Sequence, residues 1–161
     1  TRCGSIDPAI VGHVAAATGK SAKEVLDALN KKSGLLGVSG LSNDMRTVEE
    51  AASNGNDRAK LALDIFCYVL AKTIAALVVP LGRLDALVFT GGIGENSTTV
   101  REMTIARLGF LGLALDEAAN AKHGRTQNGR VTIGTKPQAL VVPTNEELMI
   151  AEDAAQIARG A

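Results

Sequence analysis

The sequence contains little that would mark a nucleic-acid-binding or disulfide-bonded protein. It has no tryptophan, only 2% aromatic residues, and two cysteines, Cys3 and Cys67, which lack the spacing of a metal site. The 17 basic residues balance 17 acidic ones, and no run of lysine and arginine occurs. A basic surface and a set of stacking aromatics are therefore both missing, and we expect no nucleic-acid partner.

Signals for export and for membrane insertion are also weak. The chain begins without a signal peptide, and its two cysteines favour a reducing compartment, so we expect a cytoplasmic protein. The one long apolar stretch, residues 61–79, contains Asp64 and Lys72. Each of these charges would cost about 2.5 to 3.5 kcal/mol near the centre of a bilayer. We therefore predict a buried helix of a soluble protein and no membrane partner.

The patterns that are present alternate between helices and a few strands. Apolar spacing and end signals predict helices over residues 5–19, 21–34, 56–79, 96–109 and 145–158, a buried strand over 84–90, and two β-type runs within 130–144. Asp7 is expected to cap the first helix, and Ser21 with Glu24 to form a capping box on the second. Residues 35–46, rich in glycine and serine, are expected to form a loop. This alternation indicates an α/β fold, in one domain over residues 1–161.

The stretch LVFTGGIGENS, residues 87–97, indicates a strand that leads directly into a glycine-rich turn and then a helix start. We call Gly91 to Asn96 the glycine segment. Such an arrangement is typical of backbone that points N–H groups at an anion, although it also suits a plain connection. The spacing Gly92-x-Gly94, with Asp116 further on, partly matches a dinucleotide-binding pattern, but Ser97 stands at the third glycine position. No Gly-Lys-Ser or Gly-Lys-Thr of a lysine-based phosphate loop occurs.

Pattern alone therefore leaves several classes of protein open. A dinucleotide-dependent oxidoreductase domain and a noncatalytic nucleotide-binding or dimerisation module both fit the glycine segment. His13 and His123 receive no role, because neither has Cys, Asp or Glu at the spacing of metal ligands.

Four stretches together carry a resemblance to a known family. TRCGSIDPAI, GVSGLSNDMR, FTGGIGENS and VVPTNEELMIA occur in this order from one end of the chain to the other. In this respect the chain resembles the carboxy-terminal part of the acetate kinases, acyl phosphate kinases of the actin-like ATPase superfamily. The resemblance implies the carboxy-terminal part of an actin-like, ribonuclease H-like domain, with a few-stranded sheet flanked by helices. It also implies an amino-terminal part that precedes Thr1.

The resemblance assigns two nucleotide-binding stretches. In the glycine segment the matching adenosine motif covers Gly92, Ile93, Gly94, Glu95 and Asn96. In SNDMR the residues expected beside the adenine and ribose are Asp44, Met45 and Arg46. From the residues alone, Asp44 and Arg46 would be interpreted as a local ion pair.

The resemblance also assigns two residues to the phosphoryl-transfer chemistry. Arg2 matches the arginine that stabilises the transition state, and Glu146 matches the residue at the magnesium position. As pattern alone, Glu146 and Glu147 are an acidic first helical turn that complements the helix dipole.

The activity that the resemblance implies is reversible phosphate transfer between ATP and acetate, giving ADP and acetyl phosphate, with Mg²⁺, in a cytoplasmic homodimer. A propionate or other short-chain acyl kinase of the same family remains an alternative. The acetate pocket and the phosphate loop of the family are expected before Thr1, and the chain by itself is expected to be inactive.

Overall fold

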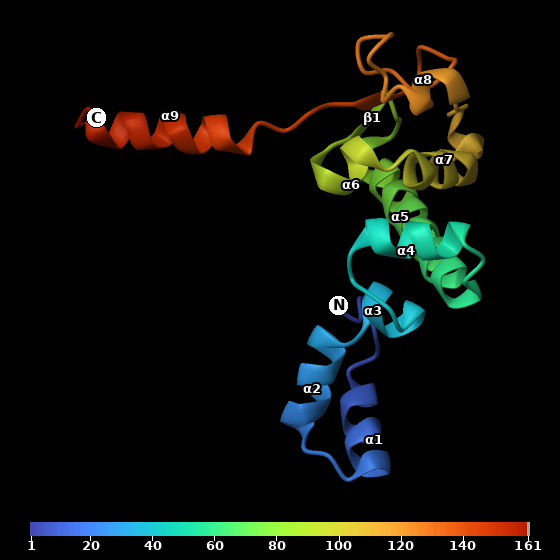
Figure 1. Ribbon diagram of the computed structural model, residues 1–161, viewed down its shortest axis with the longest axis vertical. Helices are drawn as coiled ribbons and strands as arrows, with labels where there is room; N and C mark the ends of the chain where they lie inside the picture. The colour runs from blue at the N-terminus through green and yellow to red at the C-terminus, as the bar shows by residue number, and fades with distance from the viewer. Residues whose placement is uncertain (161) are drawn as a thin grey trace. The chain divides into compact units, whose positions relative to one another are not determined.

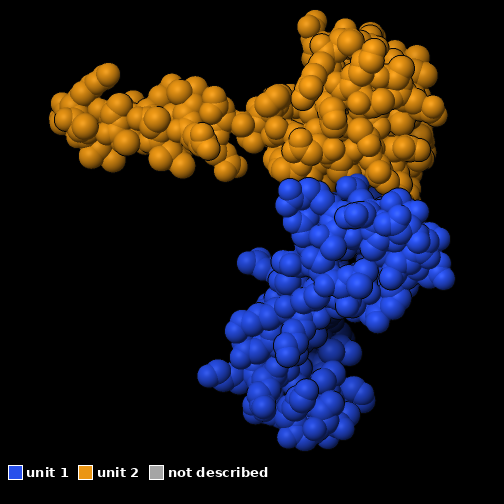
Figure 2. Space-filling view, in the orientation of Figure 1, with its two compact units in different colours: residues 1–77 blue, residues 78–161 orange. Residues whose placement is uncertain are grey.

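The computed structural model describes residues 1–160, which fall into two compact units, residues 1–77 and 78–160 (Figure 2). We call these unit 1 and unit 2. Unit 1 is helical, with α1 (Ala9–Thr18), α2 (Ala22–Lys31), α3 (Gly34–Ser39), α4 (Met45–Ser53) and most of α5 (Asp57–Leu81) (Figure 1).

The capping box expected on the second helix is confirmed, whereas Pro8 and not Asp7 is the N-cap residue of α1, and Asp7 contributes a contact from one position earlier. The Asp7 carboxylate accepts the Ala9 amide at 2.8 Å at the start of α1. Ser21 and Glu24 form a reciprocal capping box at the start of α2. However, α2 ends at Lys31 rather than continuing to Gly34, because Gly34 has a φ of +59° and starts the next helix.

The prediction of a loop over residues 35–46 is wrong, because α3 occupies the first half of this range and α4 begins at Met45. Asp44 caps α4, since its side chain accepts the Arg46 amide at 2.9 Å. Three apolar residues at helical spacing, Met45, Val48 and Ala52, are then buried. Glycine and serine at the ends of short helices gave this region its loop-like composition.

The long helix is confirmed as α5, and it continues through Pro80 to Leu81. Its buried residues are Ala59, Ala62, Leu63, Cys67 and Ala71. The helix is less buried than expected, because only 22% of its most apolar window is buried among the residues described. Within residues 1–160, α5 is the one helix long and apolar enough to cross a membrane, which by itself is weak evidence for a span.

Unit 2 contains the sheet. Its elements are β1 (Ala86–Phe89), α6 (Gly91–Asn96), α7 (Thr98–Arg107), a 3₁₀ helix, η1 (Gly109–Leu111), α8 (Glu117–Ala121), β2 (Gln138–Val141) and α9 (Glu146–Ala158). β1 and β2 pair in parallel, with Ala86 opposite Gln138 and Phe89 opposite Val141. The crossover between them holds α6, α7 and α8, as a parallel connection requires.

Three expectations for unit 2 need correction. The strand expected to be buried is β1, but Phe89 alone among its residues is buried, and Ala86 and Val88 are exposed. The first β-type run, residues 130–133, forms only isolated antiparallel bridges, from Arg130 to Leu140 and from Leu115 to Thr132. The glycine segment is not an open turn but the short helix α6, entered through Gly91 at a φ of +71°. The buried apolar residues of unit 2 are Phe89, Val100, Ile105, Leu108, Leu113, Ala119, Val131, Ala139 and Val141.

Candidate functional site

The candidate site lies where the two strands of unit 2 end. Because β1 and β2 are parallel neighbours, their carboxyl ends lie at the same edge of the sheet. The glycine segment leaves β1 at this edge, and the residues that lead to Glu146 leave β2 there. In open α/β sheets ligands bind beyond the carboxyl ends of the strands. We call this region of unit 2 the carboxyl edge.

Glu95 ties the two connections of the carboxyl edge together. Its Oε1 atom accepts the Thr144 amide at 2.9 Å, the Thr144 hydroxyl at 2.9 Å and the Gly91 amide at 3.0 Å. These donors lower the pKa of Glu95, with the Thr144 amide as the largest cause, followed by the Thr144 hydroxyl. The carboxylate therefore fixes the path of the chain after β2 against the start of α6.

The members of the glycine segment face in different directions. A Cβ on Gly92 would meet no atom within 4 Å, and Ile93 is exposed. A Cβ on Gly94 would instead lie 3.1 Å from the carbonyl carbon of Phe89. The Asn96 amide donates to the Gly92 carbonyl at 2.9 Å. The backbone at Gly92 and Ile93 is therefore the part of the segment left open to a ligand.

A cavity of about 270 Å³ lies beside the glycine segment. It is lined by Glu95 and Asn96 from α6, by His123 and Arg125 from the loop after α8, by Gly129, and by Val141 and Pro143 from the end of β2. This volume is close to the lower end of the range of about 300 to 1,000 Å³ for small-molecule sites. The carboxyl edge thus carries both a concave surface and exposed backbone.

Glu146 is the first residue of α9, and its side chain is exposed. Asn145 caps this helix, because its Oδ1 atom accepts the Leu148 amide at 3.1 Å. Glu95 positions the residue just before this cap, Thr144, and so fixes where α9 starts. Within residues 1–160, no group of three or more His, Cys, Asp or Glu side chains could hold a metal by itself. A cation here would need ligands from water or from a bound phosphate.

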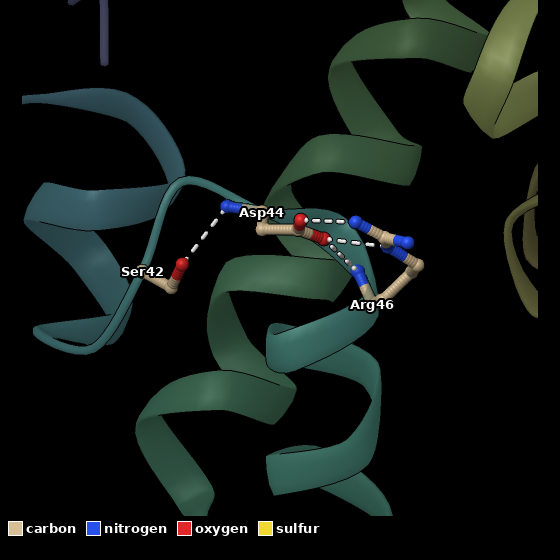
Figure 3. A network of polar contacts seen from close by, with 3 residues as sticks. All are labelled: Ser42, Asp44 and Arg46. Carbon is tan, nitrogen blue, oxygen red and sulfur yellow. Dashed lines mark hydrogen bonds and ion pairs between the residues drawn. The ribbon is translucent and has the colours of Figure 1, made fainter.

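The Asp44 to Arg46 stretch lies in unit 1 and forms the local ion pair that its residue types suggest (Figure 3). Arg46 Nη2 lies 2.8 Å from Asp44 Oδ2, and Arg46 Nε donates to Asp44 Oδ1 at 3.2 Å. The Ser42 hydroxyl accepts the Asp44 amide at 3.0 Å. The Arg46 side chain, followed by the Arg46 amide, lowers the pKa of Asp44 to about 2. Met45 is only 5% exposed, so Asp44 and Arg46 are the residues that present side chains to the surface.

Arg2 also lies in unit 1, and its side chain is exposed. Its neighbour Thr1 accepts the Ser33 amide at 2.8 Å, and a Cβ on Gly34 would lie 2.9 Å from the Arg2 carbonyl oxygen. The chain start is therefore packed against the α2–α3 connection. Arg2 lies at an apolar groove of about 680 Å³ between α3 and α5.

The residue that a dinucleotide-binding pattern would use is engaged elsewhere. Asp116 caps α8 by accepting the Ala119 amide at 2.9 Å, and it accepts the Gln127 side chain at 2.9 Å. Its position after Gly92-x-Gly94 is thus explained by a helix cap and a side-chain contact.

Sequence reasoning missed two contributors to the carboxyl edge. Thr144 gives two hydrogen bonds to Glu95, from 49 positions further along the chain. His123, which received no role, has its Nδ1 atom 2.9 Å from the Glu95 carbonyl oxygen. No local pattern signals either contact, because Glu95 lies 28 residues before His123 and 49 residues before Thr144 in the sequence.

Comparison with known proteins gives the same family over nearly the whole chain. The model of the acetokinase family matches residues 1–152. Acetate kinase 1 of Neisseria meningitidis serogroup A is 54% identical over 158 residues, which cover 98% of this chain and 40% of that protein. The chain therefore spans about 40% of the length of the curated relatives it matches.

Two solved structures show the same likeness. A propionate kinase from Francisella tularensis matches with a TM-score of 0.85 and 42% identity, over 94% of this chain and 38% of that one. An acetate kinase from Porphyromonas gingivalis matches with a TM-score of 0.85 and 40% identity, over 98% of this chain and 40% of that one. The expected α/β fold class, part of an actin-like ATPase domain, is confirmed.

Replacing Glu95 with Gln should destabilise the chain at neutral pH and matter less in acid. Because the pKa of Glu95 is lowered on folding, its stabilisation is complete above the unfolded value and is lost as the pH falls through the folded value. Urea unfolding at pH 7 should therefore show a lower midpoint for E95Q than for the parent, and the gap should narrow below about pH 4. Glu152→Gln, an exposed change on α9, is the control. If the urea midpoint of E95Q were lower than that of the parent by the same amount at every pH, the charge-assisted hydrogen bonds assigned to Glu95 would be contradicted.

Proposed function

Because the chain belongs to the acetokinase family, we propose that it forms the nucleotide-binding portion of an enzyme that transfers the γ-phosphate of ATP reversibly to acetate, giving acetyl phosphate and ADP. One observation carries this proposal. The parallel pairing of β1 and β2 brings the glycine segment and the connection to Glu146 to the same edge, where Glu95 joins them. If a nucleotide bound against Gly92 and Ile93, its phosphates and the start of α9 would lie in the same site.

We place the chain in the carboxy-terminal part of the complete enzyme, as one domain. The acetate pocket and the family's phosphate loop then belong to the part of the enzyme that this chain does not span. Arg2 is proposed to stabilise the transition state, because a planar, permanently charged guanidinium matches the equatorial oxygens of the transferred phosphoryl group. Asp44, Met45 and Arg46 are proposed to border the adenine and ribose, through the side chains of Asp44 and Arg46 and the backbone of the buried Met45. Asp44 holds the Arg46 side chain in one direction.

Glu146 is proposed to orient Mg²⁺. Glu146 is an exposed carboxylate at a helix start, which fits a small cation that keeps several waters and is held mainly by nucleotide phosphates. When bound, Mg²⁺ would offset the negative charge of the phosphates. Glu146 would direct the cation from its place on α9, and Asn145 and Glu95 would hold that place.

The acyl substrate is proposed to be acetate, by likeness to the relatives named acetate kinase. Propionate is the second candidate, because one of the structural matches is a propionate kinase. A cytoplasmic homodimer is likewise a proposal from family resemblance. We do not propose an oxidoreductase domain, because the family match covers residues 1–152 and Asp116 caps a helix.

Replacing Gly92 with Val in the complete enzyme should weaken ADP binding by at least about tenfold, since a branched side chain would stand where the nucleotide must approach. The fold should tolerate the change, because the added Cβ meets no atom within 4 Å. Isothermal titration with ADP and Mg²⁺ gives the affinity. Gly12→Val, another helical glycine with open space around it, is the matched control. Unchanged affinity in the Gly92 variant would place the nucleotide elsewhere, and no binding of ADP or ATP by the parent enzyme would reject the proposed function.

Glu146→Ala should lower turnover and raise the Mg²⁺ concentration needed for half-maximal rate far more than Glu147→Ala. Both residues lie exposed in the first turn of α9, so a dipole effect would be similar for the two. Steady-state rates over a Mg²⁺ titration distinguish the alternatives. Equal and small effects would reduce Glu146 to a residue that only stabilises the helix start.

The 161-residue chain by itself should show no acetate kinase activity. Phosphoryl transfer depends on positioning and charge stabilisation, with effective concentrations of about 10⁵ to 10⁸ M lost when the groups are not held together. A hydroxamate assay for acetyl phosphate, run beside the complete enzyme, measures this. Turnover within about 100-fold of the complete enzyme, a loss of less than about 2.7 kcal/mol, would show that the catalytic set lies within this chain.

A further inference from the structure

A fully buried arginine lies beneath the glycine segment. Arg101, on α7, has a relative exposure of 0%. Its Nη1 atom donates to the carbonyl oxygens of Gly94 at 2.8 Å and Glu95 at 3.0 Å. These carbonyls belong to the last turn of α6, where a helix leaves its acceptors without intrahelical donors. One guanidinium nitrogen therefore holds the end of the segment whose open face is Gly92 and Ile93.

The other side of the same guanidinium is anchored to the region around α8. Arg101 Nε donates to Asn120 Oδ1 at 2.7 Å, and Nη2 donates to the Asn120 carbonyl at 3.2 Å. The Asn120 side chain in turn donates to the Thr98 carbonyl at 3.0 Å, at the start of α7. Asn120 is only 3% exposed, so this anchor is itself rigidly packed. The planar guanidinium of arginine can donate hydrogen bonds to α6 and to Asn120 at the same time, whereas a lysine ammonium cannot.

His123 completes the network. Its Nδ1 atom lies 3.1 Å from Arg101 Nη2 and 2.9 Å from the Glu95 carbonyl oxygen. Because one neighbour is a donor and the other an acceptor, Nδ1 can hydrogen-bond with only one of them at a time. With Nδ1 protonated, the ring donates to the Glu95 carbonyl and links the loop after α8 to the end of α6. With Nδ1 unprotonated, it accepts from Arg101 and links that loop to α7. Its backbone has a φ of +52°, a conformation that asparagine and glycine tolerate well.

We propose that Arg101 is a positioning residue, which holds the backbone at Gly92 and Ile93 in the conformation that receives the nucleotide, with Asn120 and His123 as its anchors. The inference rests on the proposed function for the role of that backbone. Burying a guanidinium has a desolvation cost that an apolar side chain of similar volume avoids, so stability alone does not account for it. Two of its hydrogen bonds, both from Nη1, end on carbonyls of the glycine segment, adjacent to the open residues.

The test compares four variants of the complete enzyme. Arg101→Lys keeps the charge but removes the planar guanidinium. Arg107→Lys is the control, because Arg107 lies on the same helix and donates to the Met103 carbonyl within that helix. His123→Gly removes the ring while accepting the backbone conformation, and His123→Asn restores a polar side chain there. For Arg101→Lys we expect the KM for ATP to rise at least about tenfold while the KM for acetate stays within about twofold. His123→Gly should raise the KM for ATP several-fold and His123→Asn should restore it, and Arg107→Lys should match the parent.

Hydrogen exchange separates positioning from general stability. At a temperature well below unfolding, the amides of residues 91–96 should exchange faster in Arg101→Lys and His123→Gly, with the strands unchanged. If Arg101→Lys does not fold, the variants His123→Gly and His123→Asn test the inference instead, through the KM for ATP and the exchange rates of residues 91–96. Folded variants with an unchanged KM for ATP, or equal losses of affinity for both substrates, would overturn the inference. A parent enzyme that binds no nucleotide would instead reject the proposed function, and the exchange rates would still report on the anchoring.

Discussion

The parallel pairing of β1 with β2 is the constraint on which the candidate site depends. It places Phe89 opposite Val141, so two segments about 50 residues apart in sequence leave the sheet side by side. The glycine segment follows one strand and the connection to Glu146 follows the other. Without this register, the two stretches that resemble family motifs would have no shared edge. The Glu95 carboxylate then fixes the two exits to each other through Thr144 and Gly91.

The polar groups of the carboxyl edge mostly serve the protein's own backbone. Glu95, Asn96 and Arg101 each bind main-chain groups of α6 or of the connection after β2. Such an arrangement leaves Gly92 and Ile93 as the residues with open space, and it fixes their conformation in advance. A site that is preorganised in this way offers backbone to a ligand without having to order it on binding. The absence of a side chain at Gly92 is the feature that a ligand would use.

In unit 1, Asp44 likewise uses its side chain for the protein's own structure. This carboxylate caps α4 and also orients Arg46, whose side chain is 88% exposed. The capping role was hidden in the sequence by the glycine and serine residues around it, which favoured a loop. Met45, which family resemblance places beside a nucleotide base, is packed into the core instead of lying on the surface. Helix capping and core packing thus account for two of the three residues without any ligand.

The sequence by itself determined the elements whose signals are local. The capping box of Ser21 and Glu24, the long helix α5, the strand before Gly91 and the start of α7 at Ser97 all follow from residues within a few positions of one another. Four ordered motifs were also enough to indicate the family, because each is a run of adjacent residues.

Tertiary structure decided everything that joins distant residues. The pairing of β1 with β2, the reach of Glu95 to Thr144 and the burial of Arg101 against Asn120 and His123 connect positions from 19 to 52 residues apart. It also decided that residues 130–133 form bridges and not a full strand. These contacts leave no local trace in the sequence. The contact of Glu95 with Thr144 depends on the pairing of the two strands, and the contacts of Arg101 depend on how α7 and α8 pack within the crossover.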